Sequence, residues 1–236
     1  MGANGRLGLA LALMRSIIPE HLLWNSANAN AFVWRVSIHR CTVGKVSGMM
    51  MTLETERLLL RPLELADAAQ VQPLFAHWEI VEFLNDKVPW PFPADGVLHY
   101  YREVALPGIE RGDEWHWTLR LKERPDEVIG AIGLMRSRDG SEATNRGFWL
   151  GMEWQGHGLM VEAVIAVNDF WFDVLGFEVL RTSKAVANGS SRRISEKTGM
   201  RVVETGENGY VSGRWPSETW EITAEEWRAW RIRHAR

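Results

Sequence analysis

The chain has 236 residues, of which 46% are hydrophobic and 24% are charged, the proportions of an ordinary globular domain. Its formal net charge of −3 gives no electrostatic reason to expect nucleic acid or an anionic membrane as a partner. A single cysteine, Cys41, excludes an intrachain disulfide framework and argues against a cysteine-rich zinc site. We therefore expect a cytoplasmic protein without a bound metal.

The N-terminal segment, residues 1–48, differs from the rest of the chain. It shows no sustained period of 2 or 3.6 residues, and no apolar run in the chain approaches the ~20 residues needed to cross a bilayer. Three methionines, Met49 to Met51, stand immediately before the first strongly patterned segment. We expect residues 1–50 to be an extension outside the domain or the product of a misassigned translation start, and residues 51–236 to form the domain.

The patterned region opens with mixed helices and strands. In chain order we expect a strand at residues 57–61, a helix at 67–84, an extended loop at 88–93 and a helix at about 95–109. Asp67 is placed to cap the first helix, and Pro73 should kink or divide it. The loop follows from three alternating prolines, which forbid a helix.

The second half of the patterned region switches between the two periods. Residues 115–121 alternate with period 2, and apolar residues from Met160 to Val174 recur at steps of three and four. The first pattern predicts a strand and the second an amphipathic helix. The other elements are expected as strands at 128–135 and 147–150 before that helix, then a strand at 179–186, a helix at 190–198, and a strand from Val202 that pairs with 218–222 across a glycine-rich connection.

The turn Gly156-His157-Gly158 joins the strand at 147–150 to the long helix. Glycines let successive backbone N–H groups point at one place, and the helix N-terminus adds partial positive charge, so the turn is suited to an anion. Such turns also occur wherever a strand enters a helix tightly. The chain lacks G-x-x-x-x-G-K-[ST], and Val161 replaces the last glycine of G-x-G-x-x-G. These absences exclude a triphosphate loop and argue against a dinucleotide-binding fold.

A second motif begins at Asn188, thirty residues after Gly158, and reads N-G-S-S-R-R-I-S-E-K-T-G-M. The two motifs together resemble the GNAT superfamily of acetyl-CoA-dependent N-acetyltransferases, in particular its ribosomal-protein N-terminal acetyltransferases. Gln155, Gly158 and Met160 match the cofactor signature Q/R-x-x-G-x-G/A, and the second motif matches N-x-x-S-x-R…E-K-x-G-F. Stretches at 55–61, 128–130 and 147–151 agree in the same order, so the resemblance covers about residues 52–230.

The resemblance implies an α/β fold (α+β, mixed sheet), with a central, mostly antiparallel twisted sheet, a splayed strand pair and flanking helices. It implies that backbone amides from Gln155 to Met160 hold the diphosphate of acetyl-CoA. The pantetheine would pair with the strand ending at Leu150, where that strand parts from 179–186. The cofactor-binding residues implied in this way are Leu150, Gln155, Gly156, His157, Gly158, Leu159, Met160, Asn188, Ser191 and Arg193.

The catalytic residues of the family are partly replaced. Ser195 stands where many members carry a tyrosine that protonates the leaving thiolate, so we expect Ser191 to take that task unless the thiolate leaves unassisted. Asn145 stands near the place of a glutamate that acts as general base. Glu142 is our first candidate for the base, ahead of Glu114 and His116, with a surface or strand-partner role as the alternative for each.

The implied function is transfer of an acetyl group from acetyl-CoA to a primary amine by direct attack, with a protein N-terminal amine as the first acceptor. Two alternatives stay open: a small amine such as an antibiotic, polyamine or amino acid, and a catalytically silent acyl-CoA sensor. The expected partners are acetyl-CoA and the amine, without nucleic acid or membrane, and the protein is expected to be a monomer or a homodimer.

Overall fold

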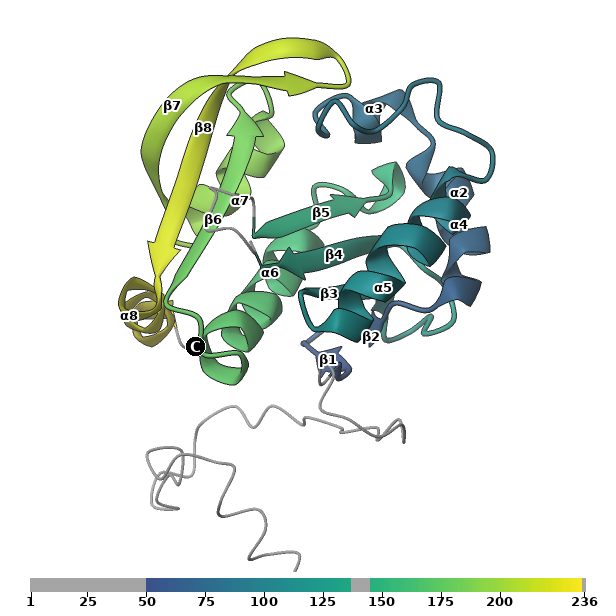
Figure 1. The fold of residues 1–236 in the computed structure, drawn as a ribbon. Coiled ribbons are helices and arrows are strands. Elements are labelled where there is room, and N and C mark those ends of the chain that lie inside the picture. Colours follow the sequence, from purple (N-terminus) through teal and green to yellow (C-terminus); the bar gives the residue numbers. More distant parts are fainter. Residues whose placement is uncertain (1–49, 137–144, 235–236) are drawn as a thin grey trace, which may run out of the picture. The chain divides into compact units, whose positions relative to one another are not determined.

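The computed structural model describes residues 50–136 and 145–234, all within one compact unit. Two antiparallel sheets form its frame (Figure 1). The first sheet contains β1 (Leu53–Glu54), β2 (Leu58–Pro62), β3 (Glu114–Leu121), β4 (Gly130–Met135) and β5 (Arg146–Leu150), side by side in that order. The second contains β6 (Val179–Ala185), β8 (Gly213–Thr223) and β7 (Arg201–Tyr210), with β8 in the middle.

The helical segments fall into groups around these sheets. Before β3 come η2 (Leu65–Asp67), α2 (Ala68–Phe75), α3 (Trp78–Val81), α4 (Gly96–Tyr100), η3 (Tyr101–Ala105) and α5 (Leu106–Arg111). After β5 come η4 (Met152–Trp154), α6 (Leu159–Asp169), η5 (Phe170–Val174), α7 (Gly189–Lys197) and α8 (Ala224–His234). The segments η3 and η5 are π-helical continuations of α4 and α6.

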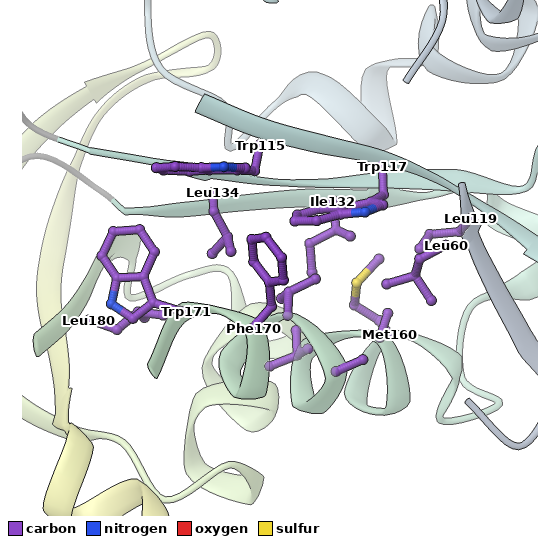
Figure 2. Packing of buried hydrophobic residues seen from close by; sticks show 14 of the residues in the cluster. Leu60, Trp115, Trp117, Leu119, Ile132, Leu134, Met160, Phe170, Trp171 and Leu180 are labelled. Carbon is purple, nitrogen blue, oxygen red and sulfur yellow. The ribbon is translucent and has the colours of Figure 1, made fainter. Parts of the chain in front are cut away.

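The main core lies between the first sheet and the helix formed by α6 and η5. Alternate residues of β3, Trp115, Trp117 and Leu119, point toward this helix, as the period of 2 predicts (Figure 2). Phe170 packs edge-to-face on Trp117, with ring centroids 5.1 Å apart. A smaller core on the opposite face of the sheet joins α2, α4 and η3 through Val71, Val97, Tyr101 and neighbouring residues.

Truncation of the main core at Phe170 is expected to be strongly destabilising. The Phe170 side chain is 1% exposed, so Phe170→Ala removes a whole ring from a packed interior. We expect a loss of about 3–5 kcal/mol in the free energy of unfolding, measured by urea denaturation. The exposed Ile232→Ala, on α8, is the control and should change stability by less than about 0.5 kcal/mol.

The strands β5 and β6 meet only where they begin. Just before β5, the backbone N–H of Asn145 donates to the carbonyl of Arg181 (2.8 Å), and the Asn145 side chain accepts from the Arg181 N–H (2.9 Å). Thr182 then donates its hydroxyl proton to the carbonyl of Arg146 (3.3 Å). The two strands belong to different sheets and diverge toward their C-terminal ends (Figure 1). The expected splayed pair is therefore confirmed.

Residues 75–92 run from β5 of the first sheet to the tip of the β7–β8 hairpin of the second. At one end, Phe75 packs on Trp149 of β5, with ring centroids 5.4 Å apart. At the other end, the tip of the β7–β8 hairpin donates backbone hydrogen bonds from Val211 to Leu84 (3.0 Å) and from Ser212 to Glu82 (3.1 Å). We call this stretch the bridging segment, since it connects the first sheet to the second.

Two expectations differ from the structure. The helix expected at 67–84 is divided after Pro73 into α2 and α3, as that proline predicts, but Asp67 does not cap α2 with its side chain. Its carboxylate instead accepts from the backbone N–H of Glu64 (3.0 Å) and from the guanidinium of Arg120 (2.6 Å). The glycine-rich connection expected after Val202 is mostly strand, because β7 and β8 continue to a tight turn between Tyr210 and Gly213. Long-range pairing outweighs the local preference of glycine for turns.

Candidate functional site

The glycine turn has the geometry of an anion site. Gly156 and Gly158 have φ angles of +81° and +79°, in the left-handed region that glycine adopts without steric cost. Gly158 is the N-cap of α6, so the free N–H groups of the first helical turn begin here. A Cβ at position 156 would meet nothing within 4 Å, which leaves the space in front of the turn open. The side chain of Gln155 anchors the turn by donating to the carbonyl of Leu150 (2.9 Å).

An arginine and a glutamate hold the turn from the side of α6. Arg57 donates from Nη1 to the carbonyl of His157 (3.1 Å) and from Nε to Glu162 (2.8 Å). Glu162 also accepts from the backbone N–H of Arg57 (2.7 Å) and from the hydroxyl of Thr55. Burial opposes the charge of Glu162, but these hydrogen bonds outweigh it and lower the pKa of the carboxyl. The pair therefore stays ionised and fixes a positive group beside the turn.

Removal of this arginine is expected to weaken binding of an anion at the turn. Arg57→Ala removes both the donor to His157 and one positive charge, and because the side chain is about half exposed the effect should be moderate. We expect about a fivefold increase in the Kd of CoA, measured by calorimetry. Arg61→Ala is the control, since Arg61 lies four residues further along the chain and its guanidinium contacts the turn at Pro125 and Asp126. An equal effect of both variants would contradict a specific role for Arg57.

The other cofactor residues expected from the sequence lie on the ends of β5, α6 and α7. The side chains of Leu150, Leu159 and Met160 belong to the main core, so their backbone groups are the parts left to face a ligand. Asn188 caps α7, with its side-chain oxygen accepting from the N–H of Ser191 (3.0 Å). Arg193 is exposed and donates to the hydroxyl of Ser190 (3.3 Å).

Of the catalytic candidates, Glu142 lies outside the described residues. Glu114 and His116 form a pair on β3, with Oε2 of the glutamate 2.6 Å from Nε2 of the histidine. They lie on the face of the sheet that α5 covers, opposite Trp115 and Trp117. Both are largely buried, so the pair is not a surface contact. Ser191 is half-buried and Ser195 is fully buried.

The His116 ring lies across β4 toward β5. Gly133 is its direct neighbour on β4, and a Cβ at that position would come within 2.7 Å of the ring atom Cε1. Gly147 is the next neighbour, on β5. Two glycines in register leave this row of the sheet without side chains between His116 and the point where β5 and β6 part. Between a ligand held at that point and the imidazole there would be only the backbone of Gly133 and Gly147.

A family model for the acetyltransferase (GNAT) domain matches residues 57–201, more than half of the chain. The chain belongs to the GNAT acetyltransferase family. It is an acetyl-CoA-dependent N-acetyltransferase, and acetyl-CoA is its co-substrate. The matched range includes β5, the glycine turn and α7, so the expected resemblance is confirmed. An open glycine turn at a helix N-terminus fits the diphosphate of CoA.

Several relatives carry this domain. An uncharacterized N-acetyltransferase p20 from Bacillus licheniformis is 28% identical over 149 residues, which are 61% of this chain and 79% of the relative. The ribosomal-protein-S5-alanine acetyltransferase from Vibrio fischeri has a TM-score of 0.63 at 18% identity, covering 75% of this chain and 98% of its own. Spermidine N-acetyltransferase from Vibrio cholerae, solved with CoA and spermine, has a TM-score of 0.61 at 18% identity, covering 72% and 98%. At these identities the two structures show that the GNAT domain shares their fold.

Two features are absent from the part of the chain that the structure describes. Among residues 50–136 and 145–234 no helix has the length and apolar character that crossing a membrane requires. The same ranges contain no group of three or more histidine, cysteine or acidic side chains placed to hold a metal ion.

Proposed function

We propose that this GNAT domain acetylates the N-terminal amine of a protein. The observation that carries the proposal is a set of exposed tryptophans around the bridging segment. Trp78 and Trp90 of that segment pack edge-to-face, with ring centroids 5.3 Å apart, and are 38% and 44% exposed. Trp215, on the hairpin, is 37% exposed and packs on Phe83. Exposed tryptophans are typical of surfaces that bind peptide side chains, whereas a small amine has no side chains to pack on three such rings.

The charge of the bridging segment favours a cationic acceptor. Glu79 and Asp86 are exposed on it, Glu82 is half-buried, and Lys87 is the one lysine or arginine in residues 75–92. An excess of carboxylates attracts a protonated amine and raises its local concentration. The amine must lose a proton before it attacks, so a base is needed as well.

We assign that base to His116, with Glu114 orienting its ring. In the proposed reaction the glycine turn holds the diphosphate and the thioester lies where β5 and β6 part. The amine nitrogen attacks the acetyl carbon and loses its proton toward His116, and the bond from carbon to sulfur breaks. Positioning of the two reactants supplies much of the rate, and proton transfer adds roughly 10²–10⁴-fold.

A polyamine is the second candidate acceptor. The same carboxylates, Glu79, Glu82 and Asp86, would attract it, and a structural neighbour is a spermidine N-acetyltransferase. The two acceptors differ in their need for the tryptophans, because a polyamine offers no side chains to pack on Trp78 and Trp90. This difference can be measured.

The test compares acceptors with and without the tryptophan surface. Acetyl-CoA is incubated with a panel of peptides with free N-terminal amines, the same peptides with blocked N-termini, and spermidine, and products are identified by mass spectrometry. We expect acetylation at the free N-terminus, and a decrease of about tenfold in kcat/KM for peptides in Trp90→Ala, while Ile232→Ala has no effect. Faster acetylation of spermidine than of any peptide would favour the second candidate. Binding of acetyl-CoA without acetylation of any amine would contradict both candidate acceptors and would favour the catalytically silent acyl-CoA sensor.

A further inference from the structure

Two buried cations lie where β5 and β6 part. Lys184 on β6 is 4% exposed, and Arg146 on β5 is 1% exposed. Lys184 comes two residues after Thr182, whose hydroxyl donates to the carbonyl of Arg146, so it lies just beyond the last contact between the strands. It points to the same face of β6 as Thr182, the face that α7 covers.

Each cation has neutral hydrogen-bond partners. The Lys184 ammonium donates from Nζ to the hydroxyl oxygen of Ser195 on α7 (2.6 Å). Arg146 donates from Nη1 to the side-chain oxygen of Asn168 on α6 (2.6 Å), and its Nε has no acceptor among the described residues. Buried polar groups without partners are rare and costly, so this arrangement calls for an explanation.

The only carboxylate that faces Lys184 from the described elements is already engaged. Glu218 on β8 accepts from Nε of Arg192 (2.9 Å) and from the indole of Trp220 (3.0 Å). The Trp220 ring is also the aromatic neighbour of Lys184, with Nζ 5.6 Å from the ring centroid. The buried region around Lys184 and Arg146 therefore has an excess of positive charge.

Burial shifts both cations toward their neutral forms, and repulsion by Arg146 adds to the shift of Lys184. Burial lowers the pKa of Arg146 to about 9. Burial, with the charge of Arg146 as a second cause, lowers the pKa of Lys184 well below its usual range, and Glu218 opposes this only in part. A lysine of this kind can release a proton at a pH where an exposed lysine would keep it.

We propose that Lys184, hydrogen-bonded to Ser195, stabilises and then protonates the thiolate of CoA as it leaves the acetyl group. The inference rests on acetyl transfer to an amine and does not depend on which amine is the acceptor. When the acetyl carbon forms its bond to nitrogen, the electron pair of the carbon–sulfur bond goes to sulfur. A proton moves from Nζ of Lys184 to that sulfur, and the resulting neutral amine regains a proton from solvent after CoA departs.

The location supports this role better than a structural one. In the proposed complex the sulfur of a thioester held between β5 and β6 is placed on the side of Lys184, which faces α7, and the carbonyl carbon on the side of the glycine row, Gly133 and Gly147, that leads to His116. The proton acceptor for the amine then lies on the α5 face of the first sheet, and the proton donor for the thiolate lies on the α7 face of the second. An anion forming between two buried cations is strongly stabilised.

The first test needs no acceptor. Free CoA is bound to the protein, and the pKa of its thiol is measured from the ultraviolet absorbance of the thiolate. We expect the bound thiol to have a pKa at least about one unit lower in the wild type than in Lys184→Met, which keeps most of the length of the unbranched side chain and removes its charge. Lys122→Met, a partly exposed lysine next to Glu54, is the control and should match the wild type.

Ser195→Ala keeps the test decisive if Lys184→Met does not fold. It removes one oxygen and with it the hydrogen bond that positions Nζ, so it should raise the pKa of the bound thiol in the same direction. Steady-state thiol release gives the second measurement. Wild-type kcat should fall as pH rises through the pKa of Lys184, and Lys184→Met should lack this fall and be roughly 100-fold slower at neutral pH.

An unchanged thiol pKa in both Lys184→Met and Ser195→Ala would overturn the proposal. It would also be overturned if Lys184→Met kept the kcat of the wild type and the fall of kcat at alkaline pH. The outcome is separable from that of the proposed function. A protein that acetylates spermidine in place of peptides contradicts the peptide acceptor and leaves the pKa comparison intact.

Discussion

Gly158→Trp is expected to abolish binding of acetyl-CoA while the domain remains folded. Position 158 has a φ of +79° and is the N-cap of α6, so a side chain there strains the backbone and fills the space in front of the first free amides. The nearest side-chain atom to a Cβ at this position is Nη2 of Arg57, 3.7 Å away, so the indole is directed to the site and not into the core. We expect the Kd measured by calorimetry to rise more than about 100-fold.

Gly206→Trp is the matched control for this variant. Gly206 lies on the exposed strand β7, and a Cβ there would meet nothing within 4 Å. Both variants should unfold cooperatively, Gly158→Trp with a modest loss from backbone strain, roughly 1–3 kcal/mol. Unchanged affinity in a folded Gly158→Trp would refute the placement of the diphosphate at this turn.

His116→Gln is expected to lower kcat by about 100-fold and to leave the affinity for acetyl-CoA unchanged. Glutamine retains a polar group beside Glu114 but cannot accept a proton from the attacking amine. The rate of thiol release under single-turnover conditions measures the chemical step. A loss of acetyl-CoA affinity equal to the loss in kcat would indicate a binding or structural role and contradict the assignment.

A glycine variant tests the same geometry without changing the histidine. Gly133→Ala places a methyl group against the His116 ring, which must rotate away from β5, so kcat should fall while the imidazole stays in the protein. Gly206→Ala is the control, since its methyl group meets nothing. Equal activity of the two variants would show that the ring position is immaterial.

The parts of the site that the sequence predicts are those built within one stretch of chain. The turn at 155–158 and the helix behind it follow from glycine chemistry and a period of 3.6, and Asn188 caps α7 where the second motif begins. The pair Glu114 and His116 was within reach, because two residues apart on a strand share a face. The preference for a carboxylate base places His116 after Glu142 and Glu114, and the order of these candidates stays a prediction.

The other parts depend on contacts between distant segments, which no local pattern records. Arg57 contacts His157, which is 100 residues away in the sequence. In the sequence, the segment 55–61 that contains Arg57 indicates only a match to the family and gives no contact for the arginine. The parting of β5 from β6 is predicted by the family resemblance and by no local pattern, because it depends on two strands that lie in different sheets. Lys184 and Ser195 are neighbours only because α7 packs back on β6. A polar residue in a strand that is otherwise apolar indicates a buried polar interaction, but the sequence does not identify the partner of that interaction.

The most direct test of this account is the structure of the protein in complex with a stable thioether analogue of acetyl-CoA. The account predicts that the diphosphate accepts hydrogen bonds from the amides that follow Gln155, and that the pantetheine passes between β5 and β6. It further predicts that the sulfur lies nearest Lys184 and the acyl carbon at the level of Gly147. A nucleotide bound elsewhere, with the glycine turn unoccupied, would contradict it.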